Sequence, residues 1–215
     1  MGTRRGSQLR RRDALVEEYS RLAQRYDTRW SFYVGATARA TMARMSVGAA
    51  DSVLDVGCGT GALLQQLALS CPTARLCGLD PVAEMLNVAR RRLPANVQLR
   101  EGWAESLPFE DGEFDAVVCC STLHHIREPL RALQEMRRVL RPGGWLTITD
   151  WCDDYLACRL CDLWLRVTRR AHFRTYGARE CMRLLEGAGL TEATLGRYKI
   201  NWWWGLMTAS ARNPK

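Results

Sequence analysis

The stretch VLDVGCGTG, residues 53–61, decides the fold of this 215-residue chain. It begins as an apolar run that contains one acid, Asp55, and it ends in a loop rich in glycine. Such a run is typical of a short buried strand, and the glycines allow a tight turn and a close approach to a ligand. A helical pattern follows at 61–70. The stretch therefore predicts a strand that turns into a helix, which is where open α/β sheets bind ligands.

The rest of the chain, from about residue 50 onward, alternates short apolar runs with helical patterns. This alternation predicts one α/β domain with a mostly parallel sheet and helices on both faces. Pro81 suits the first turn of its helix. The segment 151–189 has a largely helical pattern, and the last two apolar runs are expected to pair antiparallel. The expected strands are 52–56, 74–79, 97–100, 114–120, 145–149, 192–198 and 203–209, and the expected helices are 61–70, 81–92 and 130–140.

The composition excludes several classes of protein. A hydrophobic content of 47% and a charged content of 25% are ordinary for a globular domain. No window approaches the roughly 18 apolar residues of a membrane-spanning helix, and no apolar run follows the N-terminal arginines, as a secretory signal requires. A cytoplasmic location without a membrane span is therefore expected. The formal charge is +8, but the arginines are scattered and carry no RNA-binding signature, which disfavours nucleic acid as a partner.

The cysteines leave two alternatives open. There are nine, and the odd number argues against a complete disulfide framework. Four of them, Cys152, Cys158, Cys161 and Cys181, fall in the helical segment 151–189. They are either small apolar groups in helical cores or a site for zinc or a metalloid such as arsenite. No metal ligand is assigned.

Two acids end neighbouring expected strands. Asp55 precedes the glycine loop, where it would repel a pyrophosphate and attract an ammonium or a sulfonium cation. Asp80 ends the second strand, where an acid can accept both hydroxyls of a ribose. A plain tight turn with a helix-capping Asp80 is the alternative. The spacing Gly57-x-Gly59-x-Gly61 departs from the Gly-x-Gly-x-x-Gly loop of nicotinamide-dependent oxidoreductases and argues against that class.

Five motifs in order carry a resemblance to a known family. They are VLDVGCGTG (53–61), GLDP (78–81), AESLPF (104–109), FDAVVCCSTLHHI (114–126) and RVLRPGGWLTITD (138–150). Residues 50–150 resemble the class I S-adenosylmethionine-dependent methyltransferases, particularly the small ones related to ubiquinone and menaquinone biosynthesis methyltransferases. The resemblance implies a Rossmann-like, doubly wound, seven-stranded sheet with its last strand antiparallel. It also implies a helical lid at 1–48, and a methyltransferase domain at 49–215 with a helical acceptor-pocket insertion at about 151–189.

The resemblance further implies S-adenosyl-L-methionine as the cofactor and S-adenosyl-L-homocysteine as its product. Asp55 and the glycine loop would hold the methionine part, Asp80 the ribose, and Met85 would pack near the adenine. Where relatives often have Gly-Asp-Ala, this chain has Gly102-Trp103-Ala104, and Trp103 cannot accept a hydrogen bond from the adenine amino group. The expected cofactor-binding residues are Tyr26, Asp55, Gly57, Cys58, Gly59, Gly61, Asp80, Pro81, Met85, Trp103, Ala104, Glu105, Cys120 and Ser121.

Catalysis and the acceptor are less constrained. Methyl transfer from a sulfonium is an in-line displacement, for which His124 and His125 are the candidate bases; local packing is their alternative role. Aromatic residues and arginines mix in 151–189, which favours a small-molecule or lipid-like acceptor with an acidic group that Arg166, Arg169, Arg170 or Arg174 would meet. A catalytically silent cofactor-binding module and an RNA or protein methyltransferase remain the alternatives. The oligomeric state is open.

The N-terminal segment is expected to act as a lid. Residues 9–27 have helical spacing with one apolar stripe, and a stripe of this kind must cover another apolar surface. The open neighbour in this fold is the cofactor cleft. A helix that is permanently docked is the alternative to a moving lid.

Overall fold

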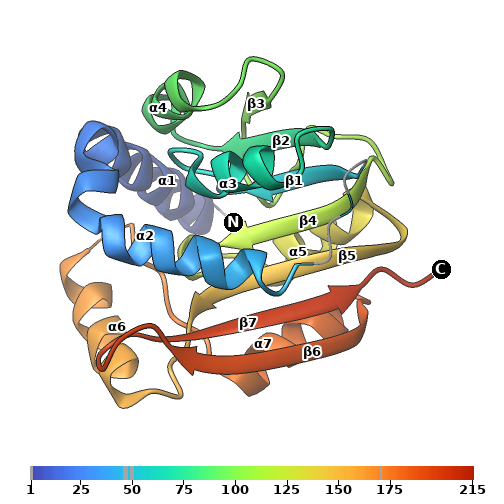
Figure 1. Ribbon diagram of the computed structural model, residues 1–215. Coiled ribbons are helices and arrows are strands. Elements are labelled where there is room, and N and C mark those ends of the chain that lie inside the picture. Colours follow the sequence, from blue (N-terminus) through green and yellow to red (C-terminus); the bar gives the residue numbers. More distant parts are fainter. Residues whose placement is uncertain (1, 46–47, 49–50, 170) are drawn as a thin grey trace.

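The computed structural model describes residues 2–45, 48, 51–169 and 171–215, and it confirms the expected α/β fold (Figure 1). Seven strands form one sheet in the order β3-β2-β1-β4-β5-β7-β6. Strands β1 to β5 pair in parallel, and β7 pairs antiparallel with both β5 and β6. The strands are β1 (Ser52–Val56), β2 (Arg75–Asp80), β3 (Gln98–Glu101), β4 (Phe114–Cys120), β5 (Leu140–Trp151), β6 (Thr191–Lys199) and β7 (Gly205–Arg212).

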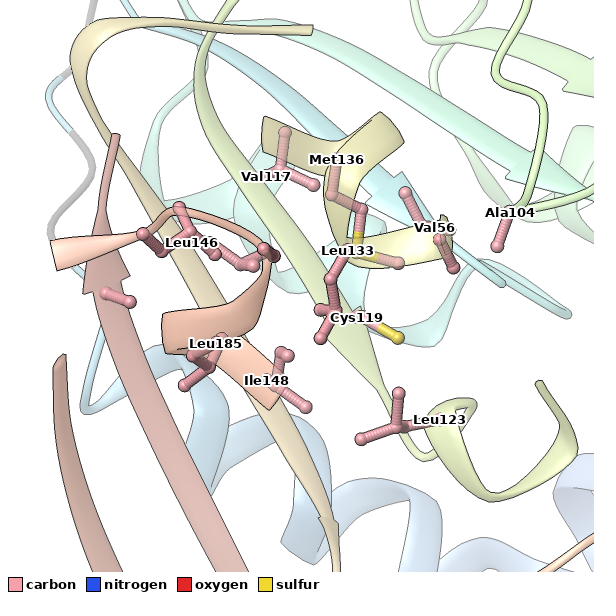
Figure 2. Packing of buried hydrophobic residues seen from close by; sticks show 14 of the residues in the cluster. Val56, Ala104, Val117, Cys119, Leu123, Leu133, Met136, Leu146, Ile148 and Leu185 are labelled. Atoms are coloured by element: carbon pink, nitrogen blue, oxygen red, sulfur yellow. The ribbon is translucent and has the colours of Figure 1, made fainter. Parts of the chain in front are cut away.

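Helices cover both faces of the sheet (Figure 1). One core cluster joins α5 and α7 to the sheet, and Figure 2 shows Leu133, Met136 and Leu185 of these helices turned toward the strands. A second cluster joins α2, α3 and α4 to the opposite face. Strand β1 contributes side chains to both clusters, because alternate side chains of a strand point to opposite faces of the sheet. The helices are α1 (Gly2–Leu22), η1 (Ala23–Arg25), α2 (Tyr26–Met42), α3 (Ala62–Ser70), α4 (Ala83–Arg92), η2 (Leu123–His125), α5 (Pro129–Val139), α6 (Leu156–Thr168) and α7 (Ala178–Gly187).

The N-terminal segment expected at 1–48 contains α1, η1 and α2, and its positions 1, 46 and 47 lie outside the described residues. Helix α1 lies across α4, where Leu15, Val16 and Tyr19 pack against the cluster of Ala23, Val82 and Met85. The apolar stripe thus has a partner surface. None of the helices among the described residues combines the length and the apolar content needed to cross a bilayer.

Most element boundaries differ from the prediction by one to three residues, and two of the differences have a clear physical cause. Pro81 precedes helix α4, which begins at Ala83, because the Asp80 Oδ1 accepts the Val82 amide (2.9 Å) and holds the chain extended. Strand β5 begins at Leu140, before the Arg141–Gly144 turn signal that was expected to precede it. Its glycines pair with a distant partner: the Gly143 amide donates to the Asn213 carbonyl (2.8 Å).

Gly61 begins helix α3 in a conformation that favours glycine. Its φ is +77°, and a Cβ added there would lie 2.8 Å from Leu93 Cδ1 and 3.1 Å from Ala89 Cβ. Both the backbone conformation and the packing of α3 on α4 therefore require the absence of a side chain. Gly61 sets the direction of the helix that leaves the glycine loop.

Gly61→Ala should lower the free energy of unfolding by about 1–3 kcal/mol, because it combines a left-handed conformation with a close contact. Gly196→Ala is the matched control: a Cβ there would meet no atom within 4 Å, and no positive φ applies. Urea unfolding of both variants tests the difference. Equal stabilities would show that neither the conformation nor the contact at Gly61 matters.

Candidate functional site

A cavity opens at the carboxyl ends of β1, β2 and β4. Its floor is the glycine loop after β1, and its walls are the residues that follow β2 and β4. Helix α1 and the beginning of α2 cover it with Leu15, Tyr19, Tyr26 and Tyr33. The register explains the convergence, since Asp55 pairs with both Gly78 and Val118 and so brings three strand ends together.

Most of the expected site residues line this one cavity. Gly61 and His124 are the two that do not: Gly61 begins α3, and His124 lies behind His125. The expected residues that line it are Tyr26, Asp55, Gly57, Cys58, Gly59, Asp80, Pro81, Met85, Trp103, Ala104, Glu105, Cys120, Ser121 and His125.

The carboxylate of Asp55 is buried at the end of β1, and its Oδ1 has no hydrogen-bond partner among the described residues. Burial, and then the charge of Asp80, raise the pKa of Asp55 to about 8. A buried acceptor without a partner is costly, so such groups mark the place of a ligand or a buried water. A cation with N–H donors fits this carboxylate, because it would supply both the missing hydrogen bond and the opposite charge.

Asp80 differs from Asp55 in that the backbone fixes its carboxylate. Its Oδ2 accepts the Gly59 amide (2.9 Å), and its Oδ1 accepts the Val82 amide (2.9 Å). Burial raises the pKa of Asp80 to about 6 in spite of these two bonds. A carboxylate has about four acceptor sites, so Asp80 can still accept further hydrogen bonds from groups in the cavity. It also ties the glycine loop to the end of β2.

Ser121 occupies the end of β4 in a conformation that is rare for a residue with a side chain. Its φ is +56°, and its amide donates to the Thr149 carbonyl (2.7 Å). The Tyr33 hydroxyl donates to Ser121 Oγ (2.8 Å), and Trp151 Nε1 donates to the same tyrosine hydroxyl. Backbone strain of this kind persists only where the surroundings hold it, and it clusters at functional sites.

His125 faces the cavity as a neutral ring. Its Nδ1 lies 2.8 Å from the Ala171 carbonyl, which can only accept, so Nδ1 carries the proton. Its Nε2 then accepts the hydroxyl of Tyr19 at 2.8 Å. Burial, and then the neighbouring His124, hold the pKa of His125 well below its ordinary value. The lone pair of His125 Nε2 is therefore bonded to the Tyr19 hydroxyl of α1, and this hydroxyl connects it to the cavity.

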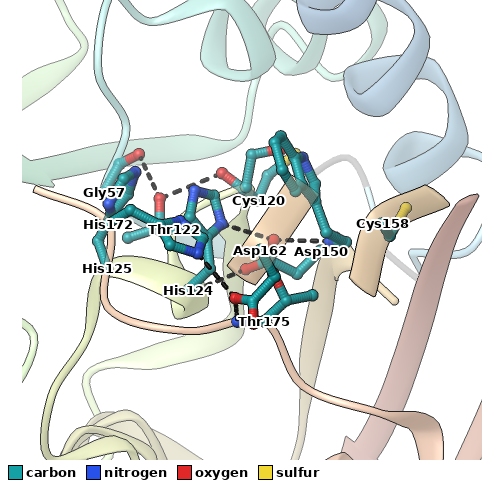
Figure 3. Close-up of polar contacts among 12 residues, drawn as sticks. Gly57, Cys120, Thr122, His124, His125, Asp150, Cys158, Asp162, His172 and Thr175 are labelled. Atoms are coloured by element: carbon teal, nitrogen blue, oxygen red, sulfur yellow. Dashed lines mark hydrogen bonds and ion pairs between the residues drawn. The ribbon is translucent and has the colours of Figure 1, made fainter. Parts of the chain in front are cut away.

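His124 supports this arrangement from behind. Its ring is buried, its Nδ1 lies 2.7 Å from Asp150 Oδ1, and its amide donates to Asp150 Oδ2 (3.0 Å). The ring centroids of His124 and His125 are 4.0 Å apart, and His172 lies close to both (Figure 3). His172 is in turn bonded to Asp162 (2.8 Å). His124 thus holds the turn after β4 and does not reach the cavity.

Three tyrosines form the roof of the site, and the sequence contained a signal for them. Tyr19, Tyr26 and Tyr33 follow one another at intervals of seven residues, which is close to two helical turns and places them on one face. Tyr26 was expected as a cofactor-binding residue and Tyr19 as part of the apolar stripe of the lid, whereas Tyr33 was not expected. Burial raises the pKa of each of the three phenols, so all are neutral at physiological pH.

The N-terminal segment is also fixed by polar contacts on both sides of the cavity. Asp27 accepts a hydrogen bond from Thr60 in the glycine loop (2.7 Å) and pairs with Arg92. Ser20 donates to Glu84 of α4 (2.6 Å), and on the opposite side Arg169 pairs with Glu18 (3.3 Å). The Arg12 guanidinium lies 4.4 Å from the centroid of the Trp103 ring, at the rim.

Three of the four arginines expected to meet the acceptor are paired with acids and do not line the cavity. Arg166 pairs with Asp162, Arg169 with Glu18 and Arg174 with Glu180, while Arg170 lies outside the described residues. The cavity is lined instead by Arg12 and Arg127. Sequence patterning does not show which side of a helix carries a paired charge.

The cysteines of the segment 151–189 are part of the packing. Cys158 Sγ lies 3.2 Å from the Gly205 carbonyl and 3.3 Å from its amide, and Cys152 and Cys181 belong to the main core cluster. Among the residues that the structure describes, no group of three or more His, Cys, Asp or Glu side chains is arranged to hold a metal ion.

Comparison with known proteins agrees with this geometry. A family model described as a methyltransferase domain matches residues 54–148. The uncharacterized protein YafE of Escherichia coli is 33% identical over 144 residues, which cover 63% of this chain and 69% of YafE. The ubiquinone/menaquinone biosynthesis C-methyltransferase UbiE of Hahella chejuensis is 37% identical over 119 residues, 53% of this chain and 48% of UbiE. The match covers only 31% and 34% of the length of two further curated relatives.

The fold is shared with solved structures. One is a chain of the complex between the Haloferax volcanii Trm112 methyltransferase activator and a methyltransferase. It superposes with a TM-score of 0.83 at 21% identity and covers 92% of this chain and 98% of that one. At this identity the likeness shows the fold alone.

The buried carboxyl of Asp55 should make the ligand-free protein less stable as the pH rises. Its folded-state pKa of about 8 exceeds its ordinary value of 3.8, so the native state holds the proton more tightly than the unfolded chain. Stability is therefore lost between about pH 4 and pH 8. Asp55→Asn removes this loss, and the variant should gain on the wild type by on the order of a few kcal/mol over that range.

Urea unfolding at several pH values measures this gain. Asp115→Asn is a control of opposite sign, because bonds from Ser52 and Arg141 outweigh partial burial and lower the pKa of Asp115. That variant should lose stability above pH 4 relative to the wild type. Parallel pH profiles for wild type and Asp55→Asn would contradict the assigned burial of an unpaired carboxyl.

Proposed function

The chain belongs to the methyltransferase domain family, and on that premise we propose that it transfers the methyl group of S-adenosylmethionine to a small-molecule or lipid-like acceptor. The observation that carries the proposal is the unpartnered, buried carboxyl group of Asp55, which shares one cavity with Asp80. This pair fits a ligand that offers an ammonium group and a ribose.

In the proposed site, each part of the cofactor meets residues that suit it. Asp55 pairs with the amino group of the methionine part, beside the backbone of the glycine loop. Asp80 accepts the ribose hydroxyls, and Met85 packs near the adenine. The Ala104 amide is available as a donor to the adenine. Trp103 lies at the rim, where its ring stacks with the Arg12 guanidinium and closes this end of the pocket. The bound cofactor supplies an electrophilic methyl group, and S-adenosylhomocysteine is the product.

The Tyr19–His125 pair is the proposed route for a proton. An acceptor hydroxyl must lose its proton when its oxygen takes the methyl group, and an acceptor ammonium must lose one before its nitrogen can attack. The Tyr19 hydroxyl can take that proton while it donates its own to His125 Nε2, so that the phenol never carries a charge. Ala171 keeps the ring oriented by accepting from Nδ1. We assign catalysis to His125 and a positioning role to His124.

The N-terminal segment acts as a lid in this scheme. Tyr19 and Tyr26 of this segment line the cavity, and Asp27 fastens the segment to the glycine loop by accepting a hydrogen bond from Thr60. The segment would thereby exclude water from the sulfonium. The lid must open for the spent cofactor to leave. The acceptor enters on the side of Tyr33, Ala171 and Phe173, an apolar wall that suits a small or lipid-like molecule.

Cofactor binding is the first test of this function. Asp55→Asn and Asp80→Ala should each weaken S-adenosylmethionine binding by about 1–3 kcal/mol, through loss of charge-assisted hydrogen bonds. Asp111→Asn, a change on the exposed surface, is the control.

Wild-type affinity should rise from pH 6 to pH 8 and binding should release a proton, because Asp55 must ionise to pair with the ammonium group. Calorimetry in buffers of different ionisation enthalpy measures both, and unchanged affinity in the two variants would remove these acids from the site.

The second test separates the proton route from the lid. His125→Asn and Tyr19→Phe should lower the methyl-transfer rate by about 10²–10⁴-fold while cofactor affinity stays within a few-fold of wild type. Deletion of residues 1–27 should keep the fold but lower both affinity and rate. Turnover is followed as S-adenosylhomocysteine formation with panels of small amines, phenols and quinol-like lipids.

Four results would contradict the proposal. Normal turnover after the deletion would rule out a lid, and normal turnover in His125→Asn would rule out the proton route. Cofactor binding without turnover on any acceptor class would favour a silent module. Methyl incorporation into RNA or protein alone would replace the small-molecule acceptor.

A further inference from the structure

Helix α6 exposes an apolar stripe that the proposed reaction does not use. Seven of the ten exposed large hydrophobic residues among the described part of the chain lie on α6 or on the adjacent Trp202–Trp203 turn. On α6 they recur at intervals of three and four residues and occupy an arc of about 100°. These five are Leu156, Leu160, Leu163, Trp164 and Val167.

The exposure is not the result of a loosely attached helix, because α6 is anchored by its opposite side. Cys161 and Leu165 pack against the cluster of Tyr33, Trp151 and Leu206. Asp162, the only acid of α6, is buried and bonded to His172. The helix is thus apolar on two faces, of which one is filled by the domain. The outer face has no covering element in the described chain.

The stripe continues onto a second segment. Leu156 and Leu160 line a surface hollow together with Trp202, Trp203 and Lys199. Figure 1 shows α6 beside the turn that joins β6 to β7, at the end of the molecule where α2 also lies. Trp202 is 80% exposed. Two segments that are distant in the sequence therefore form one apolar face, which we call the α6 face.

The charges around the α6 face are basic. Arg159 projects from one flank of the stripe, and Lys199 lies in the hollow. Arg166 lies on the same flank as Arg159, where it is paired with Asp162. Asp154, an exposed acid shortly before α6 in the sequence, is paired with Arg197 (2.9 Å). An apolar stripe of leucine and tryptophan with arginine at its edge complements the interface of an anionic bilayer. There the acyl chains are apolar, and the headgroups above them carry negative charge.

We propose that the α6 face docks the protein on anionic lipid membranes, with the leucines and tryptophans at the acyl boundary and Arg159 and Lys199 at the phosphates. The inner side of α6 contacts Tyr33 through the cluster described above, so docking would bring the acceptor side of the cavity close to the lipid surface. The membrane inference stands on the surface alone and does not depend on the proposed reaction.

Vesicle flotation tests the inference with the purified full chain. The wild-type protein should float with vesicles that contain 30% phosphatidylserine. Its binding to neutral phosphatidylcholine vesicles should be at least fivefold weaker. Higher salt should weaken its binding to the anionic vesicles. Trp164→Ser with Val167→Ser should lower anionic binding at least tenfold. Arg159→Gln should lower it about fivefold, as expected for one interfacial cation.

Leu69→Ser is the matched control, since Leu69 is 79% exposed on α3, away from the α6 face. The control and the double variant should both keep wild-type melting temperature and cofactor affinity. Wild type that does not float with anionic vesicles overturns the inference, as does unchanged flotation of the double variant. Dimerisation that the double variant abolishes, without vesicle binding, assigns the face to a second copy of the chain and also overturns it.

Discussion

The buried carboxylate of Asp55 is the constraint on which the rest of the site depends. A parallel sheet places this acid at the end of a central strand, and both neighbouring strands end beside it. Water cannot solvate it freely once α1 and α2 cover the cavity, and no residue of the described chain bonds its Oδ1. The protein thus accepts an unfavourable group in its ligand-free state, which is common where a ligand completes the bonding. Asp80, which two backbone amides hold as an acceptor, has no donor to offer the Asp55 carboxylate and carries the same charge.

Local patterns were sufficient for the sheet and for the floor of the cavity. The apolar run of β4 was predicted at its observed bounds, and the acids at the ends of β1 and β2 lie in one cavity as expected. Features that depend on distant partners were not predictable. Strand β5 extends across its turn signal because Gly143 bonds to Asn213, seventy residues away. The roles of His124 and His125 differ because one faces Asp150 and the other Tyr19 and Ala171, and their sequence positions are otherwise equivalent.

The periodicity of α6 is a second example of a sequence pattern that does not identify a distant partner. The segment 151–189 was predicted to be largely helical and to form the acceptor pocket. Within it, the apolar stripe of α6 points outward and the only acid of α6 points inward to His172, whereas Ala171 and Phe173 line the cavity. An amphipathic pattern gives the existence of an apolar face but not its partner, because a core, a ligand and a membrane surface all select the same residues. Only the packing of Cys161 and Leu165 shows which side is already filled.

The contacts of α1 also bear on how the proposed methyl transfer would proceed with an acceptor that can be methylated more than once. Helix α1 is tied to α4 through Ser20, to the acceptor side through Glu18 and to His125 through Tyr19. If α1 is the lid, it cannot uncover the cofactor side alone, because the same rigid helix covers the acceptor side. Exchange of the spent cofactor then releases the acceptor as well. Successive methylations would be distributive, so partly methylated intermediates would accumulate in solution and compete with fresh acceptor for the next turnover.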